Sequence, residues 1–192
     1  MAYPNPSSYA PLVISYTDGP TLTAAAAASC IPVGSKITLP NNFWSLGKKL
    51  HITLAGRISN VVTTPGTARF DVRTGPASAT VAFDSGALLL NIVAKTNVPF
   101  LVEIDLTCSA IGTGTSTVLR GVGRFESESV IGSPANTAGG NGSLLFPVLA
   151  TSSTTGSIGF DNTLANQLDI FFTQTVATGS MTVHQYEVME AI

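Results

Sequence analysis

Two pairs of carboxylates, each spaced two residues apart, are the side chains best suited to acid-base chemistry. The pairs are Glu103 with Asp105 and Glu126 with Glu128, and on a strand each pair would share one face. Two carboxylates so arranged could serve a glycosidase. Neighbouring expected strands offer them arginines as partners, namely Arg57, Arg69, Arg73, Arg120 and Arg124. Each such cross-strand pair contributes a few tenths to about 1 kcal/mol. Since arginine partners account for the carboxylates, we predict salt-bridge ladders and no glycosidase site.

The two histidines, His51 and His184, do not complete a catalytic or metal-binding group. His51 lies on the polar face of an expected strand and His184 in a strand of ambiguous phase, so we predict surface or interface residues. Metal sites need several ligands at short spacing, which the sequence does not offer. Its glycines match neither a phosphate-binding loop nor a nucleophile elbow. The sequence therefore predicts a protein that is not an enzyme and uses no cofactor.

Cys30 and Cys108 are the only cysteines. Cys108 continues the apolar phase of the expected strand that precedes it, which predicts a small buried thiol. Two cysteines in a chain with a large core do not make a disulfide scaffold, and their spacing fits no metal motif. A disulfide bond between them stays open at this level.

The elements that must position these side chains are strands with alternating polar and apolar residues. Residues 50–59 are apolar at almost every second position, which is the period of a half-buried strand. A Thr-Pro-Gly-Thr turn follows at 64–67. Residues 68–74 then place Phe70 and Val72 on one face and charged residues on the other. We predict an antiparallel hairpin with a charged outer face.

The same alternation recurs along the chain. The alanine-rich residues 21–30 favour an edge strand over a helix, because no polar face would solvate a helix there. Gly121 and Gly123 predict a bulge or a close approach by another backbone. About nine or ten strands without an amphipathic helix predict an all-β fold, an antiparallel β-sandwich of jelly-roll type. The further strands are expected at residues 35–39, 80–83, 87–93, 99–108, 116–125, 144–150, 167–175 and 181–189.

Residues 1–20 predict an extended N-terminal arm ahead of a single sandwich domain, residues 21–192. Its four prolines exclude a central strand or a helix, although a loose chain end would also fit. Trp44 is either a ligand platform or, as we prefer, a cover over the end of the sandwich. Anchoring side chains in the arm would contact a neighbouring subunit. They are Tyr3, Pro4, Pro6, Tyr9, Pro11 and Tyr16.

Composition narrows the possible partners. The chain has 192 residues, of which 44% are apolar and only 10% charged, with a formal net charge of −2. Without a basic field, binding to a nucleic acid is not expected. The N-terminus has neither the basic nor the apolar region of a signal peptide, and no apolar run is long enough for a membrane helix. We expect a soluble protein without a membrane partner.

Several sequence segments resemble a family of small virion structural proteins of tailed bacteriophages, some of which are capsid decoration (cement) proteins with a jelly-roll fold. The resemblance is one of overall pattern and covers roughly residues 39–190. The segments are LPNNFWSLGKKLHITLAGRIS, TPGTARFDVRTG, NVPFLVEIDLTCSAIG, VIGSPANT and FFTQTVATGSMTVHQYEVME.

This resemblance implies a non-enzymatic homotrimer on the outer surface of the virion head, assembled in the host cytoplasm. Its expected partners are the major capsid protein and neighbouring decoration subunits, which the arm would reach. Two other functions stay open, because a fold does not decide function. One is a tail or tail-fibre module that binds host surface carbohydrate, with Trp44 in its site. The other is a polysaccharide-degrading enzyme.

Overall fold

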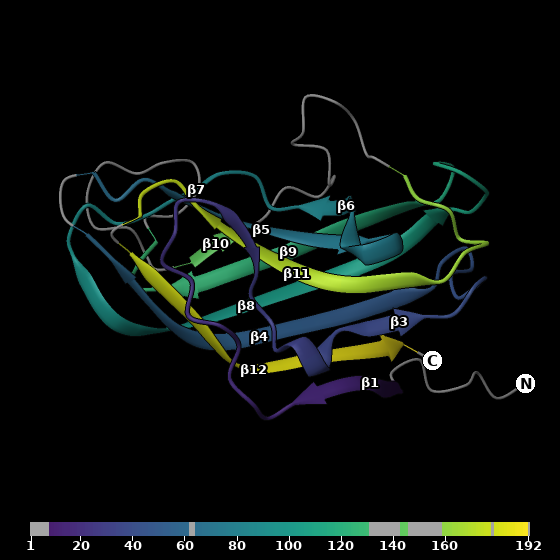
Figure 1. Ribbon diagram of the computed structural model, residues 1–192, viewed down its shortest axis with the longest axis horizontal. Coiled ribbons are helices and arrows are strands. Elements are labelled where there is room, and N and C mark those ends of the chain that lie inside the picture. Colours follow the sequence, from purple (N-terminus) through teal and green to yellow (C-terminus); the bar gives the residue numbers. More distant parts are fainter. Residues whose placement is uncertain (1–7, 62–63, 131–142, 146–158, 178, 192) are drawn as a thin grey trace, which may run out of the picture.

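Two antiparallel sheets pack face to face in the computed structural model, which describes residues 8–61, 64–130, 143–145, 159–177 and 179–191 (Figure 1). Sheet A has the strand order β1-β12-β4-β8-β9-β10. Sheet B has the order β2-β11-β5-β6, with β3 paired to β11 and β7 paired to β5. The predicted all-β antiparallel sandwich is confirmed. The jelly-roll subtype stays a prediction.

Sheet A consists of six of the described strands. They are β1 (Tyr9–Ser15), β4 (Lys49–Asn60), β8 (Lys95–Ala110), β9 (Val118–Ser127), β10 (Ser143–Leu145) and β12 (Ser180–Ala191). Sheet B is built from β2 (Ala27–Ser29), β3 (Ile37–Leu39), β5 (Thr67–Thr74), β6 (Thr80–Asp84), β7 (Leu88–Leu89) and β11 (Asn166–Gln174). Two short 3-10 turns, η1 (Val33–Ser35) and η2 (Pro76–Ser78), complete the described elements.

The core lies between the sheets and follows the alternation read from the sequence. On β8 the apolar set from Phe100 to Cys108 is at most 4% exposed. Phe70 of β5 and Phe125 of β9 meet across the two sheets with ring centroids 5.3 Å apart. Such aromatic pairs add to the stability gained from buried area. The predicted inner faces of β4, β5 and β8 are therefore confirmed.

The expected hairpin between residues 50–59 and 68–74 is wrong, because β4 and β5 belong to different sheets. β4 pairs with β12 and β8, whereas β5 pairs with β11, β6 and β7. Gly66 adopts the left-handed conformation, with φ 73°, and the turn leads the chain from sheet A to sheet B. A period of two shows which face of a strand is buried and does not show which strand lies beside it.

The segment expected as an arm forms part of the sandwich from residue 9 onward. β1 pairs with β12 along its length at the edge of sheet A, as Figure 1 shows. Leu12 and Val13 pack against the core, and Ser15 is buried. Pro11 stands at an irregularity in the register, where a missing N–H is tolerated. The prolines exclude a central strand, as expected, but they allow an edge strand.

The close approach predicted at Gly121 is made by an aromatic ring of the opposite sheet. A Cβ on Gly121 would lie 2.2 Å from Cδ2 of Phe83, which belongs to β6. The register irregularity in this hairpin lies between Cys108 and Ala110 instead. The glycine is therefore a gap into which a phenylalanine fits, and the expectation of a bulge or a second backbone there is wrong.

Three of the expected strands differ in length from the observed ones. The alanine-rich segment does form an edge strand, β2, paired with β11. The strand expected at 87–93 is reduced to β7, beyond which Leu90 forms an isolated bridge with Val130. Asn60 Nδ2 donates to the carbonyl oxygens of Asn91 and Val93 in the segment that follows. The strand expected at 144–150 is described only up to Leu145, where β10 ends.

Candidate functional site

The outer face of sheet A gathers most of the polar residues identified from the sequence. The antiparallel registers of β4, β8 and β9 place them in rows across the three strands. The rows are Lys49–Thr107–Arg120, His51–Asp105–Val122 and Thr53–Glu103–Arg124. Because directly opposite side chains on one face lie about 5 Å apart, each row can form cross-strand contacts.

Asp105, His51 and Thr53 are arranged in the order of a carboxylate, a base and a hydroxyl nucleophile. His51 Nδ1 lies 2.8 Å from Asp105 Oδ1, and His51 Nε2 lies 3.2 Å from Thr53 Oγ1. Acyl transfer also needs N–H groups that can bind an oxyanion. The backbone around His51 is held in ladders with both β12 and β8. In the described part of the chain this group is therefore a cross-strand contact, as the polar face predicted for His51 requires.

His184 lies apart from this group. It occupies the bulge between Val183 and Gln185 in the pairing of β12 with β4, which explains its ambiguous phase in the sequence. Its Nδ1 lies 2.8 Å from Oδ1 of Asp18, and both side chains are well exposed. The predicted surface position is confirmed, and the structure does not bring the two histidines together.

The predicted salt-bridge ladder exists on this face. Arg124 contacts Glu103 on the opposite strand and Glu126 on its own strand. These contacts, the hydrogen bond to Glu103 foremost, raise the pKa of the Arg124 guanidinium. Glu128 pairs with Lys95 at 3.1 Å. With Asp105 in contact with His51, each of the four carboxylates has a cationic or imidazole partner.

One row of this face differs from the others. Lys49 and Arg120 flank Thr107 and form no salt bridge within the described residues. Together with Tyr9 and Val122 they line a hollow of about 430 Å³. The Tyr9 ring comes from β1 and lies beside the His51 ring, with centroids 6.0 Å apart. The hollow thus combines two cations, a hydroxyl and an aromatic ring.

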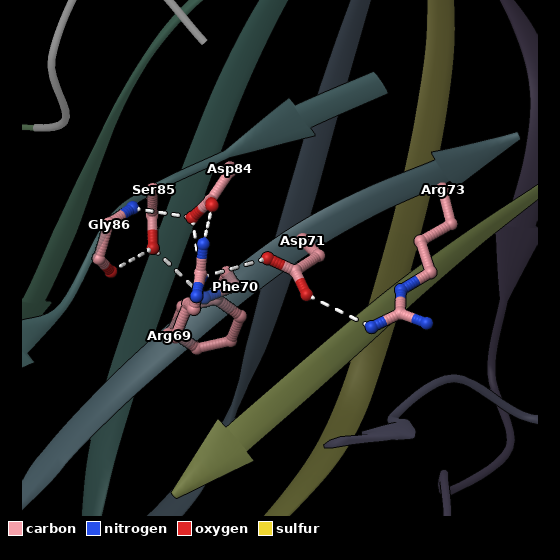
Figure 2. A network of polar contacts seen from close by, with 7 residues as sticks. All are labelled: Arg69, Phe70, Asp71, Arg73, Asp84, Ser85 and Gly86. Atoms are coloured by element: carbon pink, nitrogen blue, oxygen red, sulfur yellow. Dashed lines mark hydrogen bonds and ion pairs between the residues drawn. The ribbon is translucent and has the colours of Figure 1, made fainter. Parts of the chain in front are cut away.

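The outer face of sheet B contains a compact ionic network. Arg69 contacts both Asp84 and Asp71, and the second oxygen of Asp71 lies 3.2 Å from Arg73 Nη2 (Figure 2). The backbone N–H of Gly86 donates to Asp84 at 2.7 Å. The carboxylates are almost completely buried, Asp84 being 1% exposed. Buried charges need partners, so removing one member of this network would leave a buried charge without its partner.

Trp44 lies under three loops at one end of the sandwich. It is 3% exposed and packs edge-on against Phe43 and Phe160. The Asn162 side chain accepts from the Trp44 N–H at 3.0 Å and donates to the Trp44 carbonyl at 2.9 Å. The backbone of Asn162 also bonds to Asn42 and to Gly112. This burial agrees with a cover over the sandwich end and leaves the ring no open face for a ligand.

The candidate anchors of the N-terminal segment lie at the sheet edge where the structure describes them. Tyr9 is 54% exposed and Tyr16 is 92% exposed. Ile14, which the sequence analysis did not select, is 51% exposed and lies on the same outer face as Tyr9 and Pro11. The remaining anchors fall outside the described residues; they are Tyr3, Pro4 and Pro6.

Several contacts of interest could not be predicted from the sequence. Asn162 stands in a polar loop that resembles several others, and its role depends on Trp44, 118 residues earlier. The pairing of Arg69 with Asp84 depends on which strand lies beside β5. Lys49 and Arg120 become neighbours only through β8. The order of the strands in each sheet is the information from which these strand-to-strand contacts could have been predicted.

Comparisons with protein-family models, with curated proteins and with solved structures found no match to this chain. In the part of the chain that the structure describes, three or more His, Cys, Asp or Glu side chains never gather closely enough to hold a metal ion. Within the same residues, no helix has the length and apolar character needed to cross a membrane.

Proposed function

We propose that this protein is a non-enzymatic virion structural protein, a decoration or cement protein on the outer surface of a tailed-bacteriophage head. It binds the major capsid protein and neighbouring copies of itself, as a homotrimer, and stabilises the contacts between capsomers. The head location and the trimer rest on the sequence resemblance. The structural observation that supports attachment is the exposed apolar edge at β1.

This edge has the properties of a contact surface. β1 is the outermost strand of sheet A, so the backbone groups on its free side have no strand partner among the described residues. Ile14 and Tyr16, 51% and 92% exposed, stand at its end. An exposed strand edge with large apolar side chains readily pairs with another chain. A register irregularity at Pro11 limits uncontrolled pairing.

Attachment through a small edge is sufficient when it is repeated. A stable contact typically buries about 800 Å² per partner. A decoration protein that touches both the shell and its own neighbours gains avidity, because each further contact is formed at high effective concentration. Internal pressure must then break many such contacts before the shell opens.

The test is co-sedimentation of the purified protein with expanded phage heads that lack it. Ile14→Ser and Tyr16→Ser should each weaken binding, whereas Leu164→Ser should not. Leu164 is a matched control because it is also 51% exposed but lies in the loop before β11. Binding that is unchanged in a double Ile14 and Tyr16 variant would contradict attachment through this edge.

Deletion of residues 1–20 is a poorer test of attachment than single substitutions at the edge. That deletion removes β1, uncovers the edge of β12 and takes Leu12 and Val13 out of their contacts with the core. We therefore expect this variant to lose sheet and core contacts together with any attachment. Deletion of residues 1–7 leaves β1 intact and separates the contribution of that segment from that of the strand.

A tail or tail-fibre module that binds host carbohydrate is the second candidate function. The hollow beside Tyr9 favours it, because an exposed aromatic ring next to polar groups is suited to a sugar. Trp44 does not supply the site, since its ring is buried. Adsorption of phage particles to host cells separates the two functions. Substitution of Tyr9 in the hollow, with Trp44 unchanged, should reduce adsorption if the protein is a carbohydrate-binding tail module and leave adsorption unchanged if it is a head protein.

A further inference from the structure

Nearly every cation of this chain has a partner, and the exceptions lie together. Of the nine Lys and Arg residues, only Lys49 and Arg120 have neither a carboxylate nor a carbonyl partner among the described residues. Arg57 donates to the carbonyl of Asn97 at 3.1 Å. The others form ion pairs; they are Lys36, Lys48, Lys95, Arg69, Arg73 and Arg124.

Lys49 and Arg120 stand on either side of the same residue. Both are paired in register with Thr107, Lys49 from β4 and Arg120 from β9. Since neighbouring strands are about 4.8 Å apart, their backbones lie about 10 Å from each other. Two long cationic side chains can therefore reach a single anion placed over Thr107.

The walls of the hollow determine what kind of anion fits. Tyr9 contributes an aromatic ring, and Val122 a methyl surface that is 41% exposed. Thr107 and Asp105 contribute oxygen atoms that can accept hydrogen bonds from hydroxyl groups. At about 430 Å³ the hollow is within the range of small-ligand sites.

We propose that this hollow binds a sugar ring that carries a carboxylate. The carboxylate would lie between Lys49 and Arg120, the C–H face of the ring would contact Tyr9, and the ring hydroxyls would bond to Thr107 and Asp105. A long polyanion fits less well, because Asp105 stands in the same hollow and the chain has a net charge of −2. The site is independent of the proposed attachment through Ile14 and Tyr16.

The probe is D-glucuronate, followed by amide chemical shifts of the full-length protein during titration. D-glucose serves as the neutral sugar and sodium sulfate as an anion without a ring. Glucuronate should shift amides of β4, β8 and β9 around Thr107, with a dissociation constant lower than that for either control. Equal affinity for glucose, equal affinity for sulfate, or no shifts around Thr107 would each overturn the proposal.

Variants then identify the groups that bind. Lys49→Gln and Arg120→Gln should each weaken glucuronate binding about tenfold or more, because each removes a charge-assisted hydrogen bond. Arg57→Gln, on the same face but outside the hollow, should leave it unchanged. Neither Lys49 nor Arg120 belongs to the β1 edge, so failure of glucuronate binding and failure of head attachment are separate results. Equal binding by all three variants would overturn the assignment.

Discussion

Replacing Gly121 by alanine tests how closely the two sheets meet. The added Cβ would lie 2.2 Å and 2.4 Å from two ring carbons of Phe83, and 2.9 Å from Cδ2 of Leu106. All of these atoms are in the fully buried core, where a neighbour has little room to move. The alanine therefore forces a shift of the Phe83 ring or of the strand itself.

The size of this effect follows from two opposing contributions. Overpacking a well-filled core costs about 1–3 kcal/mol. Alanine recovers roughly 0.5 kcal/mol, because glycine loses more backbone entropy on folding. We expect a net loss of about 0.5–2.5 kcal/mol in the free energy of unfolding, and a melting temperature lower by roughly 1–10 °C for a domain of this size.

The assay is urea unfolding followed by the fluorescence of Trp44, the only tryptophan, which is buried. Gly34→Ala is the matched control, since a Cβ there meets nothing within 4 Å. A second control combines Gly121→Ala with Phe83→Leu, which removes the ring carbons that clash. The double variant should be more stable than the sum of the two single losses predicts, because the two sites are in contact.

Two results would refute this reasoning. Gly121→Ala with the stability of the parent protein would mean that the sheets are not packed as described at β6 and β9. Strict additivity of Gly121→Ala and Phe83→Leu would mean that Phe83 is not the residue that fills the space above the glycine.

Three further predictions concern the buried polar groups. Asp84→Asn should lower the free energy of unfolding in urea by about 1–3 kcal/mol, less than for a wholly buried pair because its partner Arg69 is 41% exposed; unchanged stability would contradict the network. Burial raises the pKa values of the Cys30 and Cys108 thiols, so neither should react with a thiol reagent until the protein unfolds. Rapid labelling of the native protein would contradict this burial. Because the thiols of the unfolded chain ionise at lower pH than those of the folded protein, the free energy of unfolding should fall as the pH rises above about 8.5. Asn162→Ala leaves the Trp44 backbone unpaired and should cost about 1–3 kcal/mol, with a red shift of tryptophan emission; an unchanged spectrum would contradict the cover.

Local patterns in the sequence predicted which residues are buried. The alternation at 50–59, 68–74 and 99–108 identified the inner faces, because side-chain direction along a strand depends only on neighbouring residues. The same reasoning predicted that Glu103 and Arg124 would share a polar face. It also identified β2 as a strand despite its alanines, since no polar face was available for a helix.

Strand neighbours could not be predicted in the same way. After a turn such as the one at Gly66, the next strand can either pair with the preceding strand or enter the opposite sheet. The turn residues do not distinguish the two outcomes, and the predicted hairpin of β4 and β5 is wrong for this reason. The hollow depends on Lys49 and Arg120 meeting across β8, which requires the strand order. Asn162 and Trp44 are bonded across 118 residues, and a contact at that separation leaves no local trace in one sequence.

The proposed role on a phage head is tested most directly by the copy number of this chain in purified virions. Quantitative mass spectrometry against the major capsid protein gives that number. The proposal predicts a high, fixed ratio, with the chain present in amounts of the same order as the major capsid protein. A few copies per particle would place it in the tail and favour carbohydrate binding, and its absence from virions would contradict the proposal.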